Sequence, residues 1–359
     1  MKLTIEFFSN KARFSILNQA DRVVSVKDYE LFYIKDKNNL EVIFNKILAG
    51  KKIDIVAILL AFGGDIFSEP SRVDRFFLNK LYSLMPDYPL YIPSVCDVLS
   101  ILLDILIDIE IVAFFQTSFF KNLLSQDMYY AIPRKISDKD NFKRNGFHGI
   151  YHEFNSSRST ENEKMISLVF DGQTTLSAVD RGRPRLVSLG YTPLEGIMGD
   201  RTSGDIDPGI IFYLMKKTGM NIFQIDELLK LKSGFKGLTG YDMSKRELLK
   251  FYGKDKNIDL AFDLYINQII KYIGEAIAVL GGLDRIEISG SEAGYLIQII
   301  RRILKEISFL GINLKPLPWD ISSKSTVITS KISNIKVGIN NYFLSEIVSK
   351  KLNDLIKLG

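Results

Sequence analysis

The chain contains two histidines, His148 and His152, which stand one helical turn apart. Imidazoles at this spacing can share a metal ion, but a zinc site needs further His, Cys or carboxylate ligands. No carboxylate or thiolate cluster stands beside the pair in the sequence. We therefore expect His152 to be a packing or surface residue. An isolated histidine is usually structural, so His148 taken alone could have that role.

Two turns offer backbone N–H groups as a second kind of chemistry. One is predicted at residues 9–12, and the other at 171–175 (DGQTT). Backbone N–H groups that converge in such turns can bind phosphate. Two turns facing each other across a cleft are typical of a two-domain phosphotransferase. A generic α/β protein is the other interpretation that the pattern leaves open.

The elements that position these turns alternate between strands and helices in the first half, and helices dominate the second. This rhythm predicts an α/β protein. Strands are predicted at 2–8, 13–17, 53–60, 110–115, 165–170, 176–180, 285–288 and 335–339, and helices at 40–49, 73–83, 98–107, 260–280, 295–307 and 342–358.

Composition narrows the class of protein. A chain of 359 residues allows two or three domains, and 46% hydrophobic with 25% charged residues is typical of a globular protein. The single cysteine, Cys96, excludes an internal disulfide and fits a reducing compartment. The net charge of +5 is spread along the chain without a basic, aromatic-rich cluster, which argues against nucleic acid. We expect no targeting segment and no membrane span, because the apolar stretch 53–62 is short and 98–115 is interrupted by acids.

Residues 192–196 (TPLEG) and 203–209 (SGDIDPG) resemble a motif of the acetate kinase family. Further stretches resemble that family at 130–133 (YAIP), 143–152 (KRNGFHGIYH), 232–240 (KSGFKGLTG), 242–243 (DM), 271–274 (KYIG) and 280–284 (LGGLD). The resemblance is specific over residues 112–292 and thin outside them.

This resemblance implies an ASKHA fold, the two-domain α/β fold of actin, Hsp70 and hexokinase, with an interdomain cleft. It places residues 1–145 and 341–359 in the first domain, with the C-terminal helix returning to it, and 146–340 in the second. It also implies ATP and Mg²⁺ as cofactors, a short carboxylate as substrate, a cytoplasmic location, and a homodimer joined through the second domain.

The resemblance also assigns site residues. It gives His148 and Arg201 catalytic roles toward the transferred phosphoryl group. Arg201 stands one residue before the family's arginine position, which Thr202 occupies, so a solvated loop arginine is the alternative. The nucleotide-binding residues that it implies are Asp171, Gly172, Gln173, Asp242, Met243, Gly290, Ser291 and Glu292. For 171–175 a plain β-turn is the alternative.

Other positions depart from the family's pattern. Leu59 stands where the family has a substrate-binding arginine, and Gln116 where it has the catalytic aspartate. Phe7 and Phe8 replace part of a polar N-terminal turn. Arg13 is expected to be an exposed strand residue, and an arginine that reaches into the cleft is the alternative. The family's metal-supporting glutamate has no counterpart in 340–344, and the nearby Glu346 is expected on a helix surface.

These departures predict a cleft in which neutral side chains replace most of the charges that handle the phosphoryl group. Removing a single preorganised donor typically costs about 10²–10³ in rate. We therefore expect an acetate kinase reaction that is impaired. A non-catalytic nucleotide-binding or regulatory protein is one alternative. A phosphotransferase with a changed substrate, using Asp171 to organise a metal, is the other.

Overall fold

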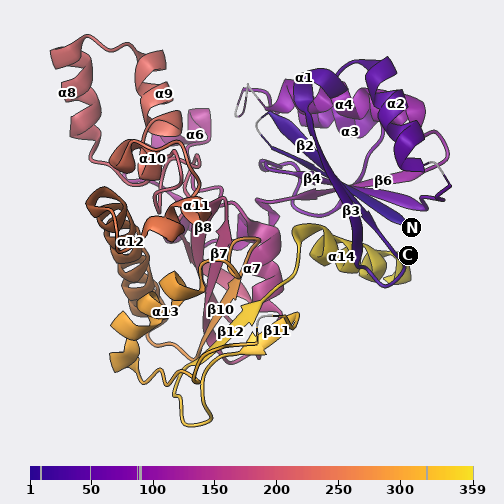
Figure 1. The fold of residues 1–359 in the computed structure, drawn as a ribbon. Coiled ribbons are helices and arrows are strands. Elements are labelled where there is room, and N and C mark those ends of the chain that lie inside the picture. Colours follow the sequence, from indigo (N-terminus) through magenta and orange to yellow (C-terminus); the bar gives the residue numbers. More distant parts are fainter. Residues whose placement is uncertain (9, 49, 87, 89–90, 321, 359) are drawn as a thin grey trace.

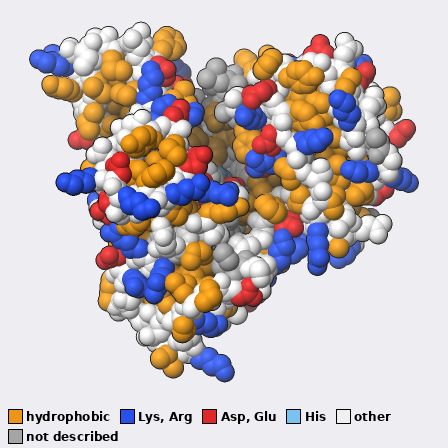
Figure 2. Space-filling view, in the orientation of Figure 1, with side chains coloured by type: hydrophobic (Ala, Val, Ile, Leu, Met, Phe, Trp, Pro, Cys, Tyr) orange, Lys and Arg blue, Asp and Glu red, His pale blue; other side chains and the backbone are white. Residues whose placement is uncertain are grey.

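A computed structural model describes residues 1–8, 10–48, 50–86, 88, 91–320 and 322–358 of the chain. It shows two lobes, each built on a six-stranded mixed sheet (Figure 1). A deep groove separates the two lobes on the face shown in Figure 2. The α/β class and the two-lobed architecture expected from the sequence are confirmed.

The first sheet has the strand order β3-β2-β1-β4-β6-β5. Its strands are β1 (Lys2–Phe7), β2 (Lys11–Leu17), β3 (Val23–Glu30), β4 (Ile55–Leu60), β5 (Ser71–Arg72) and β6 (Glu110–Phe115). Strands β1, β4 and β6 run parallel, whereas β2, β3 and β5 pair antiparallel with their neighbours. One face packs on α1 (Leu31–Ile34), α2 (Lys37–Leu48), α3 (Arg75–Tyr82) and α4 (Ile92–Ile105).

The second sheet repeats this plan, with the order β11-β12-β10-β7-β8-β9. Its strands are β7 (Lys164–Asp171), β8 (Gln173–Asp180), β9 (Arg183–Val187), β10 (Arg285–Ser289), β11 (Ser325–Val327) and β12 (Lys336–Asn340). Strands β7, β10 and β12 run parallel. One face packs on α12 (Lys256–Leu280) and α13 (Ile297–Glu306). The hairpins β1–β2 and β7–β8 therefore occupy equivalent places in the two lobes.

Two helices fill the space between the sheets. Helix α7 (Gly149–Ser156) lies on the second sheet, and α14 (Leu344–Leu358) returns to the first sheet. Their apolar faces join Leu59 of β4 and Val169 of β7 in one buried cluster. The hydroxyl of Ser349 and the amide of Asn353 donate to Asp21 at 2.5 and 2.8 Å, which ties α14 to the first lobe.

The remaining elements lie mostly on the second lobe, where α8 and α9 project as a helical hairpin (Figure 1). They are α5 (Ser125–Met128), α6 (Arg134–Asp140), α8 (Pro208–Thr218), α9 (Ile222–Leu231), α10 (Gly234–Thr239), α11 (Lys245–Leu248) and the 3-10 turns η1 (Ser118–Asn122), η2 (Leu249–Phe251) and η3 (Ser308–Leu310). Among the described helices, none is both long and apolar enough to cross a bilayer.

The predicted five-residue turn at 171–175 is wrong. Strand β8 begins at Gln173, so Thr174 and Thr175 are buried strand residues and the turn is centred on Gly172. Gly172 has a φ of +67°, a conformation that glycine adopts without strain and that allows this tighter connection. The first predicted turn includes Ser9, which lies outside the described residues. The domain boundaries stay a prediction.

Candidate active site

His148 stands in a strained position at the start of α7. Its φ is +58°, which is uncommon for a residue with a side chain. Two glycines allow the tight approach around it. A Cβ on Gly146 would lie 2.2 Å from the Phe120 ring, and one on Gly149 would lie 2.3 Å from the Gln116 carbonyl oxygen. Backbone strain of this kind often marks functional sites, so the local geometry supports a role for His148 in the cleft.

Both histidines contact one threonine hydroxyl. Thr175 Oγ1 lies 3.1 Å from His148 Nδ1 and 2.9 Å from His152 Nε2. His152 is fully buried, so it is the packing residue that we expected. Its other nitrogen, Nδ1, lies 2.7 Å from Ser167 Oγ. Burial lowers the pKa of both imidazoles, which favours their neutral forms. The pair is thus joined by hydrogen bonds through Thr175.

The groove is more highly charged than the motifs predict. Glu6, at the end of β1, interacts electrostatically with Asp171 of the second lobe and with Arg13. Arg13 makes a bidentate ion pair with Asp28, at 2.8 and 2.9 Å. Asp171 also interacts with His148. An acid and a base of the first lobe therefore lie near the side of the groove that carries His148, and the motifs did not predict this pair.

The environment of Glu6 disfavours its charged form. Burial is the main cause, and the negative charge of Asp171 adds to it, although Arg13 opposes both. Together they raise the pKa of Glu6 to about 8. A carboxyl group that titrates near neutrality inside a cleft is a candidate for a functional group.

Phe7 does not face the groove. Side chains alternate along a strand, and Phe7 points into the core beneath α1–α4 while Glu6 points the other way. Phe7 is the last residue of β1, within the strand predicted at 2–8.

A hollow of about 490 Å³ opens beside the β7–β8 turn, within the size range of small-molecule sites. Predicted nucleotide residues supply part of its wall, namely Gly172, Gln173, Asp242 and Met243. Gly199, Asp200, Arg201, Thr202, Ser244 and Glu247 complete it.

Lys245 fixes the turn beneath this hollow. Its side chain is fully buried, and Nζ donates to the Gly172 carbonyl oxygen at 2.6 Å and to Asp200 at 2.8 Å. Glu292 lies 3.2 Å from the same Nζ and also accepts from the Gly172 N–H at 3.1 Å. The two acids raise the pKa of Lys245 against the effect of burial, so the ammonium keeps its charge.

The loop 290–292 docks against the same turn. Ser291 Oγ donates to Asp171, and a Cβ on Gly290 would lie 2.2 Å from the Phe170 carbonyl oxygen. Gln173 donates to the Pro193 carbonyl oxygen at 2.8 Å, which joins the turn to the 192–196 motif. The structure thus brings all the predicted nucleotide residues together around the β7–β8 turn.

Arg201 lies in the wall of the hollow and is paired with Asp242 at 2.7 Å, with its side chain 53% exposed. Lys236 pairs with the same carboxylate at 3.0 Å. A catalytic role requires Arg201 to lie near the phosphates of the nucleotide. Its position in the wall of the hollow is compatible with that role.

Two family positions are buried and neutral. Leu59 is 1% exposed in the apolar cluster between the lobes, and Gln116 is 8% exposed at the N-terminus of α7. Gln116 Oε1 accepts from the Ile150 N–H at 3.4 Å. Glu346, by contrast, is not the surface residue that we expected. It is 4% exposed, accepts from the Phe343 N–H at 3.1 Å at the start of α14, and pairs with Lys324 at 2.5 Å.

Several motifs that carry the family resemblance contact one another through side chains. Glu195 accepts hydrogen bonds from Tyr130 and Arg144. Asp205 accepts from the Gly196 N–H at 2.7 Å and from the Tyr272 hydroxyl at 2.6 Å. These side chains fix the conformation of the 190–205 loop, so their contacts are structural.

Sequence reasoning missed Glu6, Thr175 and Lys245. The strand alternation of β1 could have pointed to Glu6, since it interrupts an apolar run. No local signal identifies Lys245 or Thr175, because their roles arise from contacts between distant segments.

The chain matches the model of the Acetokinase family over residues 6–341. It is 33% identical to an acetate kinase of Corynebacterium jeikeium over 271 residues, covering 73% of this chain and 67% of that protein. It is 30% identical to an acetate kinase of Acetivibrio thermocellus over 293 residues, covering 79% and 73%.

Solved structures show the same fold. The acetate kinase of Porphyromonas gingivalis superimposes with a TM-score of 0.88 at 23% identity, covering 99% of both chains. A propionate kinase of Francisella tularensis superimposes with a TM-score of 0.87 at 21% identity, covering 98% of both chains.

Proposed function

The chain belongs to the acetokinase family, and on that premise we propose that it binds Mg·ATP beside the β7–β8 turn and transfers the terminal phosphoryl group to a short carboxylate. We further propose that its reaction with acetate is impaired. The observation that carries the nucleotide assignment is the hollow beside Gly172, which the predicted nucleotide residues line from separate segments.

His148 has the geometry for a phosphoryl-binding donor. Its Nδ1 contacts Thr175, and no described residue hydrogen-bonds to its Nε2. Phosphoryl transfer requires donors and cations that neutralise charge on the moving group. We assign His148 Nε2 to a phosphoryl oxygen. We assign Arg201 to the same phosphate after it leaves Asp242, which its exposure permits.

The residues present fit a Mg²⁺ ion that arrives with the nucleotide. The described part of the chain holds no group of three or more His, Cys, Asp or Glu side chains that could bind a metal ion. Mg²⁺ bound to ATP needs only one or two carboxylates, because phosphate and water supply the other ligands. Asp171, held by Ser291 at the turn, would contact it. The ion would neutralise charge on the phosphates.

The acceptor side explains the proposed impairment. Leu59 cannot bind a carboxylate, and Gln116 cannot accept a proton. Each loss of a preorganised group costs about 10²–10³ in rate, although such losses do not add simply.

A coupled assay of ADP release with acetate, ATP and Mg²⁺ tests this proposal. We expect low acetate-dependent turnover, and a rise of about 10-fold or more in the Gln116→Asp variant, since a general acid–base group contributes about 10²–10⁴. Gln116→Glu is the matched control, because its longer side chain places the carboxylate elsewhere. High turnover in the unmodified chain would contradict the impairment.

A changed acceptor is a second candidate, favoured by the charged corner that Glu6, Arg13 and Asp28 form in the first lobe. An arginine beside the groove suits an anionic acceptor. The same assay with propionate, butyrate and formate in place of acetate distinguishes this candidate. Turnover with none of them, together with Mg·ATP binding, would favour a non-catalytic nucleotide-binding or regulatory protein.

We also propose a cytoplasmic homodimer joined through the second lobe. The α8–α9 hairpin supports this arrangement, because α8 buries no side chain within one chain. Its exposed apolar residues gather on the projecting hairpin (Figure 2), and they are Ile210, Phe212, Tyr213, Met215, Ile222, Phe223 and Leu231. Contiguous apolar surface of this kind marks protein interfaces. Light scattering at several protein concentrations tests it, and a monomer throughout would refute it.

A further inference from the structure

We infer that a chain of buried hydrogen bonds, running from Glu287 to His148, fixes the proton of the His148 imidazole on Nε2. Neutral His148 then presents an N–H donor to the groove. The position of the proton follows from the structure alone, whereas its use in phosphoryl transfer rests on the proposed function.

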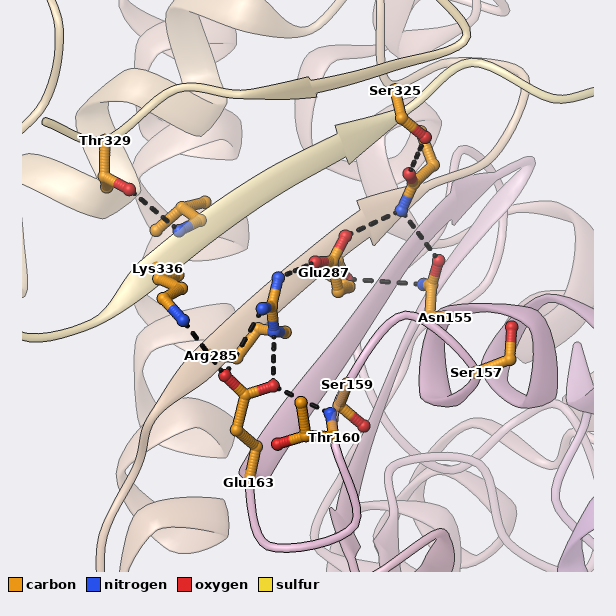
Figure 3. Close-up of polar contacts among 12 residues, drawn as sticks. Asn155, Ser157, Ser159, Thr160, Glu163, Arg285, Glu287, Ser325, Thr329 and Lys336 are labelled. Atoms are coloured by element: carbon orange, nitrogen blue, oxygen red, sulfur yellow. Dashed lines mark hydrogen bonds and ion pairs between the residues drawn. The ribbon is translucent and has the colours of Figure 1, made fainter. Parts of the chain in front are cut away.

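The chain begins at a charged acceptor. Glu287 is 3% exposed on β10, and its carboxylate pairs with Arg285 at 2.8 Å. Arg285 in turn pairs with Glu163 at 2.9 Å, as Figure 3 shows. Gly338 leaves room for the Glu287 carboxyl group, because a Cβ at this position would lie 2.4 Å from Glu287 Oε2. Burial raises the pKa of Glu287, and Arg285 and Asn340 oppose this shift by donating to its two carboxyl oxygens, so both oxygens act as acceptors.

This acceptor orients two amides in succession. Asn340 Nδ2 donates to Glu287 at 2.8 Å and to Asn155 Oδ1 at 3.3 Å, while its own oxygen accepts from Ser325 at 2.6 Å. Figure 3 shows Asn155 reaching from α7 toward β10 at this point. Because the oxygen of Asn155 is an acceptor here, its NH₂ group must face the other way.

The orientation then passes to a serine. Asn155 Nδ2 donates to Ser167 Oγ and to Ser289 Oγ, both at 2.9 Å, with the Glu287 carbonyl oxygen farther away at 3.3 Å. Ser167 therefore accepts from Asn155, and its single O–H is left to donate to His152 Nδ1 at 2.7 Å.

The two histidines complete the chain. His152 Nδ1 accepts from Ser167, so the proton of this neutral imidazole lies on Nε2 and is donated to Thr175 Oγ1 at 2.9 Å. Thr175 then donates its own O–H to His148 Nδ1 at 3.1 Å. His148 Nδ1 is consequently an acceptor, and the remaining proton of His148 is on Nε2.

Because these side chains are buried, no water can replace a partner and reverse the donor-to-acceptor direction of the hydrogen bonds. The relative exposure of Asn155, Ser167, His152 and Thr175 is 0%. Each of these side chains is hydrogen-bonded to the next one, and a buried donor or acceptor without a partner would cost about 1–3 kcal/mol. Reversal would require several groups to turn together, and both carboxyl oxygens of Glu287 already accept hydrogen bonds, from Arg285 and from Asn340.

Proton-detected NMR of protein labelled with ¹⁵N-histidine tests the inference directly, because the chain has only two histidines. We expect both imidazoles to be neutral, with the proton on Nε2 and a bare Nδ1. The couplings from ring carbon-bound protons to each nitrogen distinguish the tautomers. A proton on Nδ1 of His148 would overturn the inference.

Thr175→Val separates positioning from packing, since valine keeps the shape of threonine and removes its hydroxyl. We expect His148 to become a mixture of tautomers, while phosphoryl transfer falls by about 10-fold to 100-fold at nearly constant KM. Thr175→Ser retains the hydroxyl, so it should restore the Nε2–H signature and recover most of the lost rate. An unchanged His148 signature in Thr175→Val would refute the chain.

Glu287→Gln tests the far end, because an amide can donate as well as accept. We expect tautomer mixtures at both histidines in this variant. The spectra are measured on the protein without substrate, so they report the chain even if phosphoryl transfer is absent. The proposed function fails on the activity measurement alone, and the inference fails on the spectra alone.

Discussion

The two lobes share one strand order but bury different chemistry on their facing sheets. On the groove side of β4, the buried residues are Ile55, Ala57 and Leu59, which pack on α14. The equivalent strand β10 presents Glu287 and Ser289 toward α7. Strand β4 thus serves as an apolar support, whereas β10 carries polar contacts of the hydrogen-bonded chain that ends at His148. The difference teaches that equal topology does not imply an equal share in function.

Removing the carboxyl group of Glu287, at the far end of the hydrogen-bonded chain, should have the largest effect on stability. Glu287→Ala removes one of the two acids that pair with Arg285 in the described part of the structure, and breaking a buried ion pair costs about 3–5 kcal/mol. We expect the free energy of unfolding in urea to fall by about that amount. A loss below about 1 kcal/mol would show that the polar lobe does not depend on this pair.

Leu59→Ala makes the matched change in the apolar lobe. Leu59 is 1% exposed, and a Leu→Ala substitution in a core costs about 2–5 kcal/mol. We expect a stability loss without any change in the tautomer of His148, which separates the two lobes. If the histidine signals change as they do in Glu287→Gln, the apolar surface also positions the site, and the comparison fails.

The groove itself should respond to pH through Glu6. Its pKa rises from 4.5 to about 8 on folding, so the folded protein binds an extra proton between these values. The stabilisation by Glu6 is therefore fully present below pH 4.5 and is lost as the pH rises through about 8. The free energy of unfolding falls by no more than about 1.4 kcal/mol per pH unit over this range. Glu6→Gln should remove this loss. Equal pH profiles of the free energy of unfolding in both proteins would contradict the assignment.

The smallest effect on stability is expected on the α8–α9 hairpin. Phe223 is 81% exposed, so Phe223→Ser should change the free energy of unfolding of the monomer by no more than about 0.5 kcal/mol. We expect it instead to weaken self-association, as measured by sedimentation. Unchanged association would remove this residue from the proposed dimer surface.

Much of the fold could be predicted from the sequence. The strands β4 and β6 and the helix α12 follow from apolar periodicity, because their burial depends on local pattern. The short strand β9 and the helix α7 were missed. Helix α7 begins at a histidine with positive φ and lacks a side-chain cap, so no start signal precedes it.

The site was predicted only in part. The resemblance led to His148 and to the turn at Gly172, because a motif or a turn marks them in the sequence. Glu6 is close in space to Asp171 only after both lobes form, and Lys245 reaches Gly172 from a separate helix. Long-range contacts of this kind leave no periodic trace, so the charge of the groove was underestimated.

Thermal unfolding of one protein sample with either Mg·ATP or acetate tests the central claim most directly. A ligand at about 100 times its Kd stabilises the folded state by about 2.7 kcal/mol. We predict a clear rise in Tm with millimolar Mg·ATP and none with acetate at the same concentration. A rise with acetate alone, or no rise with Mg·ATP, would contradict a second lobe that retains the nucleotide beside a first lobe that has lost the acetate clamp.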